Sequence, residues 1–283
     1  MSDRLQPGEP VVLAPGVRRL VAPNPGLMTG PGTNTYLFGE REVAVLDPGP
    51  DMPEHIERIL EVAGAPIGWL LATHTHPDHS PAVEPLRERT GATAIGMPAP
   101  AGPHQDRTFA PDHVPTDGEV LTTDDFELAM LHTPGHASNH VCFLHQASRL
   151  LFTGDHIING STVVIDPPDG NMNDYLDSLG RLRNLSIDAI AGGHGELIQA
   201  PYEAIDWLVE HRLRREAKVV DTLNRLPDVL VSELVADVYD EVAPALHPVA
   251  QRSLLAHLLK LEEDGAAVVD NDRWRLVDAH PAG

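Results

Sequence analysis

The sequence predicts an α/β (α+β) chain of two domains, in which a mixed domain of strands and helices precedes a winged helix. Up to about Ala200, short apolar runs with strand character alternate with helical patterns. After Tyr202 the pattern changes to three helices followed by a short hairpin, which is the element order of a winged helix. We therefore predict a mixed first domain at residues 1–205 and a winged-helix-like domain at residues 206–283.

Strands and helices of the first domain follow from hydrophobic periodicity. Its predicted elements are strands at residues 42–46, 67–73, 126–131, 140–144 and 150–153, helices at 53–63 and 173–185, and a long loop or lid at 98–117. In the first helix, Ile56, Leu60 and Ala63 fall at helical spacing behind a proline that suits the first turn. The loop is rich in Pro, Gly, Asp and His, which are residues that interrupt regular structure.

The second domain has its own helix and turn signals. We predict helices at 203–225, 233–242 and 249–264 and a hairpin at 266–277. Gly265 would close the third helix as a left-handed cap. The first helix carries a basic cluster, Arg212, Arg214 and Arg215, which is a candidate nucleic-acid contact or a set of surface ion pairs. The alternative to a winged helix is a helical tail that packs on the first domain.

Composition narrows the class of protein. The chain has 283 residues, of which 42% are hydrophobic and 22% are charged, so it is neither disordered nor fibrous. The longest clearly apolar stretch, residues 66–72, is far shorter than the roughly 20 residues of a membrane span. Residues 1–4 do not lead into an apolar segment, and the single cysteine, Cys142, excludes an internal disulfide. We expect a cytoplasmic protein with no membrane partner and no secretory leader.

The charge is strongly acidic. The chain holds 20 Lys+Arg against 42 Asp+Glu, a formal net charge of -22. Residues 201–283 alone hold 9 basic and 16 acidic residues, so this segment carries 9 - 16 = -7. A field of this sign repels phosphate backbones and disfavours broad, non-specific binding of nucleic acid.

The densest motif is the string THTHPDHS, which directly follows an apolar strand. On an extended segment, residues i and i+2 point the same way, so His74 and His76 can hold one metal ion. Pro77 forces a turn, after which Asp78 and His79 can face a second ion beside the first. The string therefore predicts a two-metal site at the carboxyl end of a strand.

Further ligands are available on distant turns of the same kind. His136, Asp155 and His194 each follow or end an apolar strand and lie in a glycine-containing turn. Glycine lets the backbone turn sharply and approach a metal closely. Asp47 ends another strand in the same manner. Each turn alone is weak evidence for a metal site. All of them in this order after the histidine string are strong evidence.

In this order the motifs resemble the metallo-β-lactamase superfamily, over roughly the first 200 residues. The resemblance implies an αββα sandwich with two metals at one edge. It implies that the first metal is bound by His74, His76 and His136, the second by Asp78, His79 and His194, and both by a bridging Asp155. It also implies that Asp47 holds the ligand loop by hydrogen bonds without binding metal.

Nearly the whole chain is similar to the winged-helix-tailed subfamily of the β-lactamase-like protein 2 endoribonuclease, through motifs that are less specific than the metal ligands. The similarity lies in residues 31–37, 174–179 and 254–265. This similarity favours phosphodiester bonds in RNA as the substrate. The acidic charge of the chain disfavours such a substrate.

Two metals at such a site imply a particular chemistry. Ions that share a water lower its pKa from 15.7 to about 7, so that a bridging hydroxide attacks an ester-type bond. Asp78 and Asp155 would orient that nucleophile and are the predicted catalytic residues. Mixed histidine and carboxylate ligands suit two zinc ions best, with manganese or iron as alternatives.

The substrate stays open between several classes. Asp155 stands where zinc β-lactamases typically carry a cysteine or serine, so β-lactams are expected to be poor substrates. Besides the phosphodiester prediction, the alternatives are a thioester or lactone hydrolase of the glyoxalase II or lactonase type, and a winged-helix nucleic-acid-binding regulator with a non-catalytic metal domain. The partner is therefore a small-molecule or oligonucleotide substrate. The second domain, which supplies no predicted ligand, would cover the site, mediate self-association into a homo-oligomer, or present a large substrate.

Overall fold

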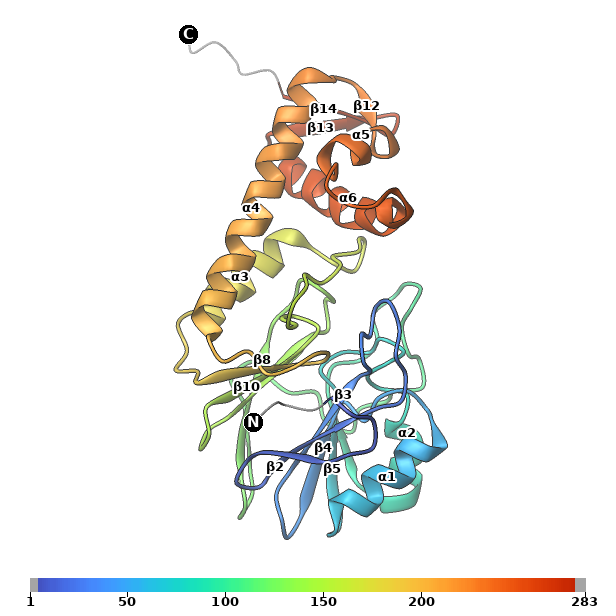
Figure 1. Cartoon of the computed structure of the whole chain (residues 1–283), viewed down its shortest axis with the longest axis vertical. Helices are drawn as coiled ribbons and strands as arrows, with labels where there is room; N and C mark the ends of the chain where they lie inside the picture. The colour runs from blue at the N-terminus through green and yellow to red at the C-terminus, as the bar shows by residue number, and fades with distance from the viewer. Residues whose placement is uncertain (1–4, 278–283) are drawn as a thin grey trace.

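Figure 1 shows a computed structural model of the chain, in which residues 5–277 are described. Residues 1–4, on which the prediction of no secretory leader rests, lie outside this range. Two β-sheets pack face to face in the lower part of the view, and the long helix α4 (Pro201–Arg225) leads from them to a separate group of elements at the top. Within residues 5–277, no helix is both long and apolar enough to cross a membrane.

The first sheet has six strands within the described range, in chain order. They are β1 (Val11–Ala14), β2 (Val17–Val21), β3 (Asn34–Phe38), β4 (Val43–Leu46), β5 (Ile67–Leu71) and β6 (Thr93–Ile95). Val43 and Val45 pack toward helix α1 (Pro53–Ala63), whereas Ala44 and Leu46 face the other sheet. Because both faces of β4 are covered, the strand is apolar throughout. Helix α2 (Val83–Thr90) packs on the same outer face as α1.

The second sheet has five strands among the described residues. Their order is β11 (Ala189–Gly192), β10 (Leu150–Gly154), β9 (Val141–His145), β8 (Glu127–His132) and β7 (Val120–Thr122). In β9, Val141 and Phe143 face the first sheet, whereas Cys142 and Leu144 face helix α3 (Met172–Leu182). Burial raises the pKa of the Cys142 thiol to about 12, so this thiol is chemically inert. The layers are helix, sheet, sheet, helix, which confirms the predicted αββα sandwich.

The C-terminal domain is a winged helix, as predicted. Its elements after α4 are β12 (Val229–Leu230), α5 (Val231–Val238), the 3₁₀ turn η1 (Pro244–Leu246), α6 (His247–Glu263), β13 (Ala267–Asp270) and β14 (Arg273–Leu276). Its core combines Leu223 of α4, Leu234 of α5, Leu258 of α6 and Trp274 of β14. The predicted helices and hairpin are all present, although α5 ends at Val238 instead of residue 242.

Helix α4 joins the two domains. Its first half places Ile205 and Leu208 in the core beneath α3, whereas Val219 and Leu223 of its second half belong to the winged-helix core. The predicted boundary between residues 205 and 206 thus falls within α4, and the division of the chain at that point stays a prediction.

Helix α6 turns toward the first domain and lies above its loops (Figure 1). Ser253 Oγ accepts a hydrogen bond of 3.2 Å from the backbone N–H of Ile165. Glu263 accepts another of 2.7 Å from the Asn173 amide at the start of α3. The winged helix is therefore docked on the first domain, and the predicted alternative of a simple helical tail is wrong.

Candidate metal centre

The histidine string occupies the loop that follows β5, and Asp47 fixes its shape. Asp47 adopts a left-handed backbone conformation, with φ 48, that costs on the order of 1–3 kcal/mol. This conformation lets its carboxylate accept hydrogen bonds from the Thr73 N–H at 2.7 Å and the Thr73 hydroxyl at 2.8 Å. The same carboxylate lies 2.9 Å from His79 Nδ1. A proton on Nδ1 leaves Nε2 of His79 free to face the centre.

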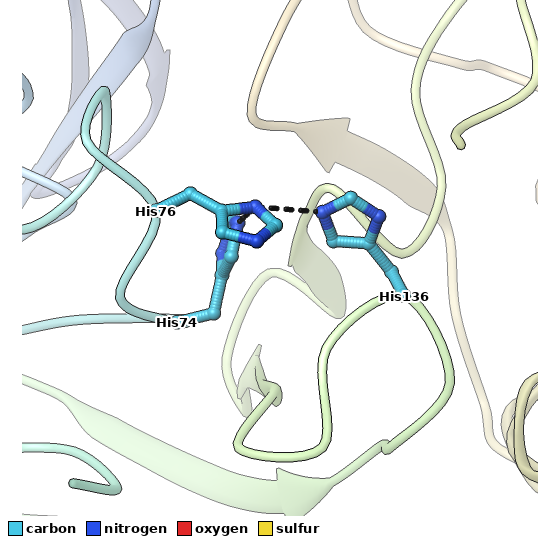
Figure 2. Close-up of side chains that lie close together, drawn as sticks. All are labelled: His74, His76 and His136. Carbon is cyan, nitrogen blue, oxygen red and sulfur yellow. Dashed lines mark hydrogen bonds between the residues drawn. The ribbon is translucent and has the colours of Figure 1, made fainter. Parts of the chain in front are cut away.

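Three histidine rings converge at the first group of candidate ligands (Figure 2). His76 Nδ1 lies 3.0 Å from His74 Nε2 and 3.0 Å from His136 Nε2. The far nitrogen of His136 lies 2.7 Å from the Val164 carbonyl oxygen, and that of His74 lies 2.9 Å from the Thr73 hydroxyl. These bonds turn both Nε2 atoms inward.

The rings of His74 and His76 in this first group are electrically neutral. Burial, with the neighbouring His136, lowers the pKa of His76 to about 3. Burial also lowers the pKa of His74 well below its usual range. Neutral imidazole is the form that binds a metal, so His74 and His76 need lose no proton to do so.

A second group combines carboxylates with histidines. Asp78 Oδ2 lies 3.2 Å from His194 Nε2 and 3.5 Å from His79 Nε2. Asp155 Oδ1 lies 3.3 Å from His194 Nε2 and 3.5 Å from His79 Nε2. The other oxygen of Asp155 lies 3.8 Å from His136 Nε2 in the first group. Asp155 therefore faces both groups, one oxygen to each.

Protons balance the charge of the second group. Burial opposes protonation of His194, but Asp155 and Asp78 outweigh it and raise the pKa of His194 to about 10. Burial likewise opposes ionisation of Asp155, but His194 and His79 hold its pKa well below the usual range. A divalent cation would replace these protons in neutralising the carboxylates.

Two observations test whether a cation fits between these side chains. Among the described residues, His79 Nε2, His194 Nε2 and Asp155 Oδ1 are buried without a hydrogen-bond partner, although they face one another. Buried polar atoms are normally paired, so a cation among them supplies what they lack. A Cβ on Gly193 would lie 2.7 Å from Asp155 Oδ1 and 2.7 Å from His79 Cε1, so glycine keeps this space open. The residues present fit a metal pair.

The structure thus brings together every predicted ligand from four separate loops, which follow β5, β8, β10 and β11. Two further buried histidines, which the sequence analysis did not single out, lie behind them. His140 Nδ1 lies 3.0 Å from the Thr133 hydroxyl, and its ring centroid lies 5.1 Å from that of His74. The ring of His156 packs against Tyr175 at 4.7 Å. Both histidines lie close in the sequence to the predicted ligands His136 and Asp155, and this closeness could have indicated that they belong to the site.

Two cavities adjoin the centre among the described residues. The larger, about 500 Å³, extends from the centre to the winged helix, and we call it the upper lobe. Its aliphatic lining is formed by Leu27, Met28, Ile158, Val163, Val164, Val242, Leu246, Val249 and Ala250. The smaller, about 330 Å³, lies beside the loops at residues 101–105 and 166–169, and we call it the lower lobe. The winged helix therefore covers the site, which was one of its three expected roles.

Sequence comparison agrees with this geometry. The sequence model of the metallo-beta-lactamase superfamily matches residues 28–194, more than half of the chain and a span that contains every candidate ligand. The chain belongs to the metallo-beta-lactamase superfamily. The model of the beta-lactamase associated winged helix domain matches residues 231–274. Like the hydrolases of this superfamily, the chain is a metal-dependent hydrolase.

Individual relatives span most of the chain. A beta-lactamase-like protein 2 homolog from Drosophila melanogaster is 31% identical over 271 residues, covering 89% of this chain and 90% of the relative. An atrochrysone carboxyl ACP thioesterase from Aspergillus chevalieri is 31% identical over 262 residues, covering 86% and 81%. A metallo-beta-lactamase family protein from Thermus thermophilus superimposes with a TM-score of 0.79 at 23% identity, over 94% of this chain and 100% of that structure.

Proposed function

We propose that the chain is a two-metal hydrolase of thioesters that carry an apolar acyl group. The observation that carries this proposal is the aliphatic lining of the upper lobe, which adjoins His136, Asp155 and His194. A cavity of about 500 Å³ has the size of a small-molecule site, and aliphatic side chains make up much of its lining.

In this proposal zinc is the metal, because mixed histidine and carboxylate ligands suit it, with manganese or iron as substitutes. His74, His76 and His136 would hold one ion, Asp78, His79 and His194 the other, and Asp155 both. Such a pair activates water and polarises the bond under attack. Asp78 and Asp155 would offset part of the metal charge and would orient the attacking water by accepting a hydrogen bond from it.

The covalent change is a simple hydrolysis. The water oxygen forms a bond to the acyl carbon, and the bond from that carbon to sulfur breaks. Sulfur leaves with the bonding electrons and takes a proton, which gives a carboxylic acid and a thiol. An ester or lactone would react in the same way with oxygen as the leaving atom.

The charges in the upper lobe support an uncharged acyl group over a phosphodiester. The two arginines that line it are already engaged. Arg212 is buried, donates a hydrogen bond of 2.6 Å to the Val163 carbonyl and lies over the Tyr175 ring. Arg215 pairs with Glu241 and lies 4.0 Å above the Tyr239 ring centroid. Binding a phosphate here would require breaking these contacts.

The relatives lend support to both substrate classes. The thioesterase of Aspergillus chevalieri shares 31% identity with this chain, and the resemblance to an endoribonuclease subfamily favours RNA. Phosphodiester cleavage therefore remains our second candidate.

A substrate panel decides between the two candidates. The zinc-loaded protein would be assayed with acetyl, butyryl and hexanoyl thioesters of N-acetylcysteamine, a lactone, bis(p-nitrophenyl) phosphate, a short RNA and nitrocefin. Because each buried methylene contributes about 0.8 kcal/mol, kcat/KM should rise roughly 3- to 4-fold per methylene while the chain fits. Faster cleavage of RNA than of every thioester would overturn the proposal.

A further inference from the structure

We propose that the substrate straddles the metal centre, with its acyl group in the upper lobe and its thiol arm in the lower lobe. This inference rests on the proposed thioesterase function and assigns the two halves of the substrate to separate surfaces. It makes the winged helix the determinant of acyl selectivity and the loops of the catalytic domain the determinant of leaving-group selectivity.

The two lobes meet at the metal centre. Four residues line both cavities, and they are Met28, His136, Asp155 and Val164. Two of them, His136 and Asp155, belong to the metal centre, so the centre lies at the junction of the lobes. The bond that breaks must lie at the centre. The two groups that it joins then extend in different directions, one into each lobe.

The upper lobe suits the acyl group. Its wall on the winged-helix side includes the aliphatic residues Val242, Leu246, Val249 and Ala250, beside Tyr239, Ser253 and Glu241, whose carboxylate pairs with Arg215. The four aliphatic side chains come from η1, α6 and the segment before them, and they offer no charge to a ligand. An alkyl or aromatic acyl chain placed here leaves water for an apolar surface, which favours longer chains.

The lower lobe presents charged and polar side chains beyond the metal centre. Besides the residues of the metal centre, it is lined by Asp166, Asp169, His104, Gln105 and Arg252, together with prolines and small residues. Asp166 lies 3.3 Å from Arg252, and Asp169 accepts a hydrogen bond of 3.2 Å from the Gln105 amide. An apolar chain here would desolvate these groups without replacing their hydrogen bonds to water.

The charge of the lower lobe predicts which thiol arms it accepts. Its two carboxylates outside the metal centre, Asp166 and Asp169, add to the strongly acidic charge of the chain, and Arg252 offsets part of it. A negative surface attracts a cationic arm and repels an anionic one. We therefore expect thiocholine esters to be cleaved faster than thioesters of mercaptosuccinate that carry the same acyl group.

Two selectivity ratios test the assignment. The acyl ratio is kcat/KM for hexanoyl over acetyl on a fixed thiol, and the leaving-group ratio is kcat/KM for thiocholine over mercaptosuccinate on a fixed acetyl group. Val249→Trp fills the upper lobe and should lower the acyl ratio about 10-fold or more, because several methylenes lose their apolar contact. Val249→Ala should raise it. Asp166→Asn should lower the leaving-group ratio several-fold.

Each variant should move its own ratio and leave the other within about twofold. Val12→Trp is the matched control, since Val12 is 72% exposed in β1 and lines neither lobe. Circular dichroism and metal content would be measured for every variant, and Val249→Ala keeps the test valid if the tryptophan variant does not fold. If the Val249 variants shift the leaving-group ratio, or both ratios move together, the assignment is wrong. If the wild-type protein cleaves no thioester, the proposed function itself fails.

Discussion

Asp155 is the side chain on which the two halves of the centre depend, because its oxygens face different groups of histidines. Replacing it by asparagine removes a negative charge and one ligand from each ion. We expect Asp155→Asn to lower bound metal from about two ions per chain to one or fewer. Activity should fall by more than the 10- to 100-fold typical of losing a residue that only supports a ligand. Elemental analysis and initial rates measure both quantities.

The matched control is Asp51→Asn, because Asp51 is an exposed acid in the turn before α1. It changes the net charge of the chain by the same amount. If the Asp155 variant retained both its metal and its activity, the bridging role would be wrong.

Gly193 tests the space between the ligands. A methyl group there would lie 2.7 Å from both Asp155 Oδ1 and His79 Cε1, closer than van der Waals contact allows. We expect Gly193→Ala to reduce metal content at unchanged far-ultraviolet circular dichroism. Gly180→Ala on α3 is the control, since a Cβ at that position meets no atom within 4 Å. Full metal occupancy in the Gly193 variant would show that the ligands do not close around this point.

At this scale the sequence identified the candidate ligands because each lies in a short motif with its own turn chemistry. The positions of Val249 and Ala250 in the upper lobe could not be predicted, because they depend on how two domains dock. The basic cluster shows the same limit. Arg214 forms a surface ion pair with Glu210, as the alternative of surface ion pairs predicted. Arg212 instead points into the core and donates a hydrogen bond to a backbone carbonyl. A run of arginines does not reveal which of them is buried.

Among the elements, α6 fixes the position of the winged helix. Ser253 is buried and accepts the hydrogen bond from the Ile165 N–H. Ser253→Ala would leave that N–H buried without a partner, at a cost of about 1–3 kcal/mol. We expect a lower midpoint of urea unfolding, compared with an exposed control, Ser232→Ala in α5. Equal midpoints would show that this contact does not hold the domains together.

Element boundaries show where periodicity stops being informative. Helix α1 matches its predicted range, because a proline begins it and Gly64 ends it in a left-handed conformation. The strand predicted at 67–73 ends at Leu71, since the chain must turn there to present the histidines. Strand β2 was not predicted, because Arg18 and Arg19 interrupt its apolar pattern, although Arg19 is buried. Strand β6 has only three residues, too few to show any alternation.

For the whole molecule, charge and docking together argue against a nucleic-acid-binding regulator. In helix-turn-helix proteins the second helix of the motif enters the DNA groove. Here that helix is α6, which lies on the catalytic domain, and the chain carries a net charge of -22. We expect no retention of duplex DNA in a gel-shift assay at low salt, where electrostatic binding is strongest. A salt-sensitive shift at micromolar protein would contradict this prediction.

The central claim is that two metal ions held by this set of side chains perform the hydrolysis, and a metal titration tests it most directly. Chelated protein would receive zinc in steps while release of thiol from a butyryl thioester is followed. We expect no turnover without metal and a rise that reaches its plateau at about two equivalents per chain, as a two-metal site requires. Undiminished turnover in the chelated protein, or a plateau at one equivalent, would contradict the account.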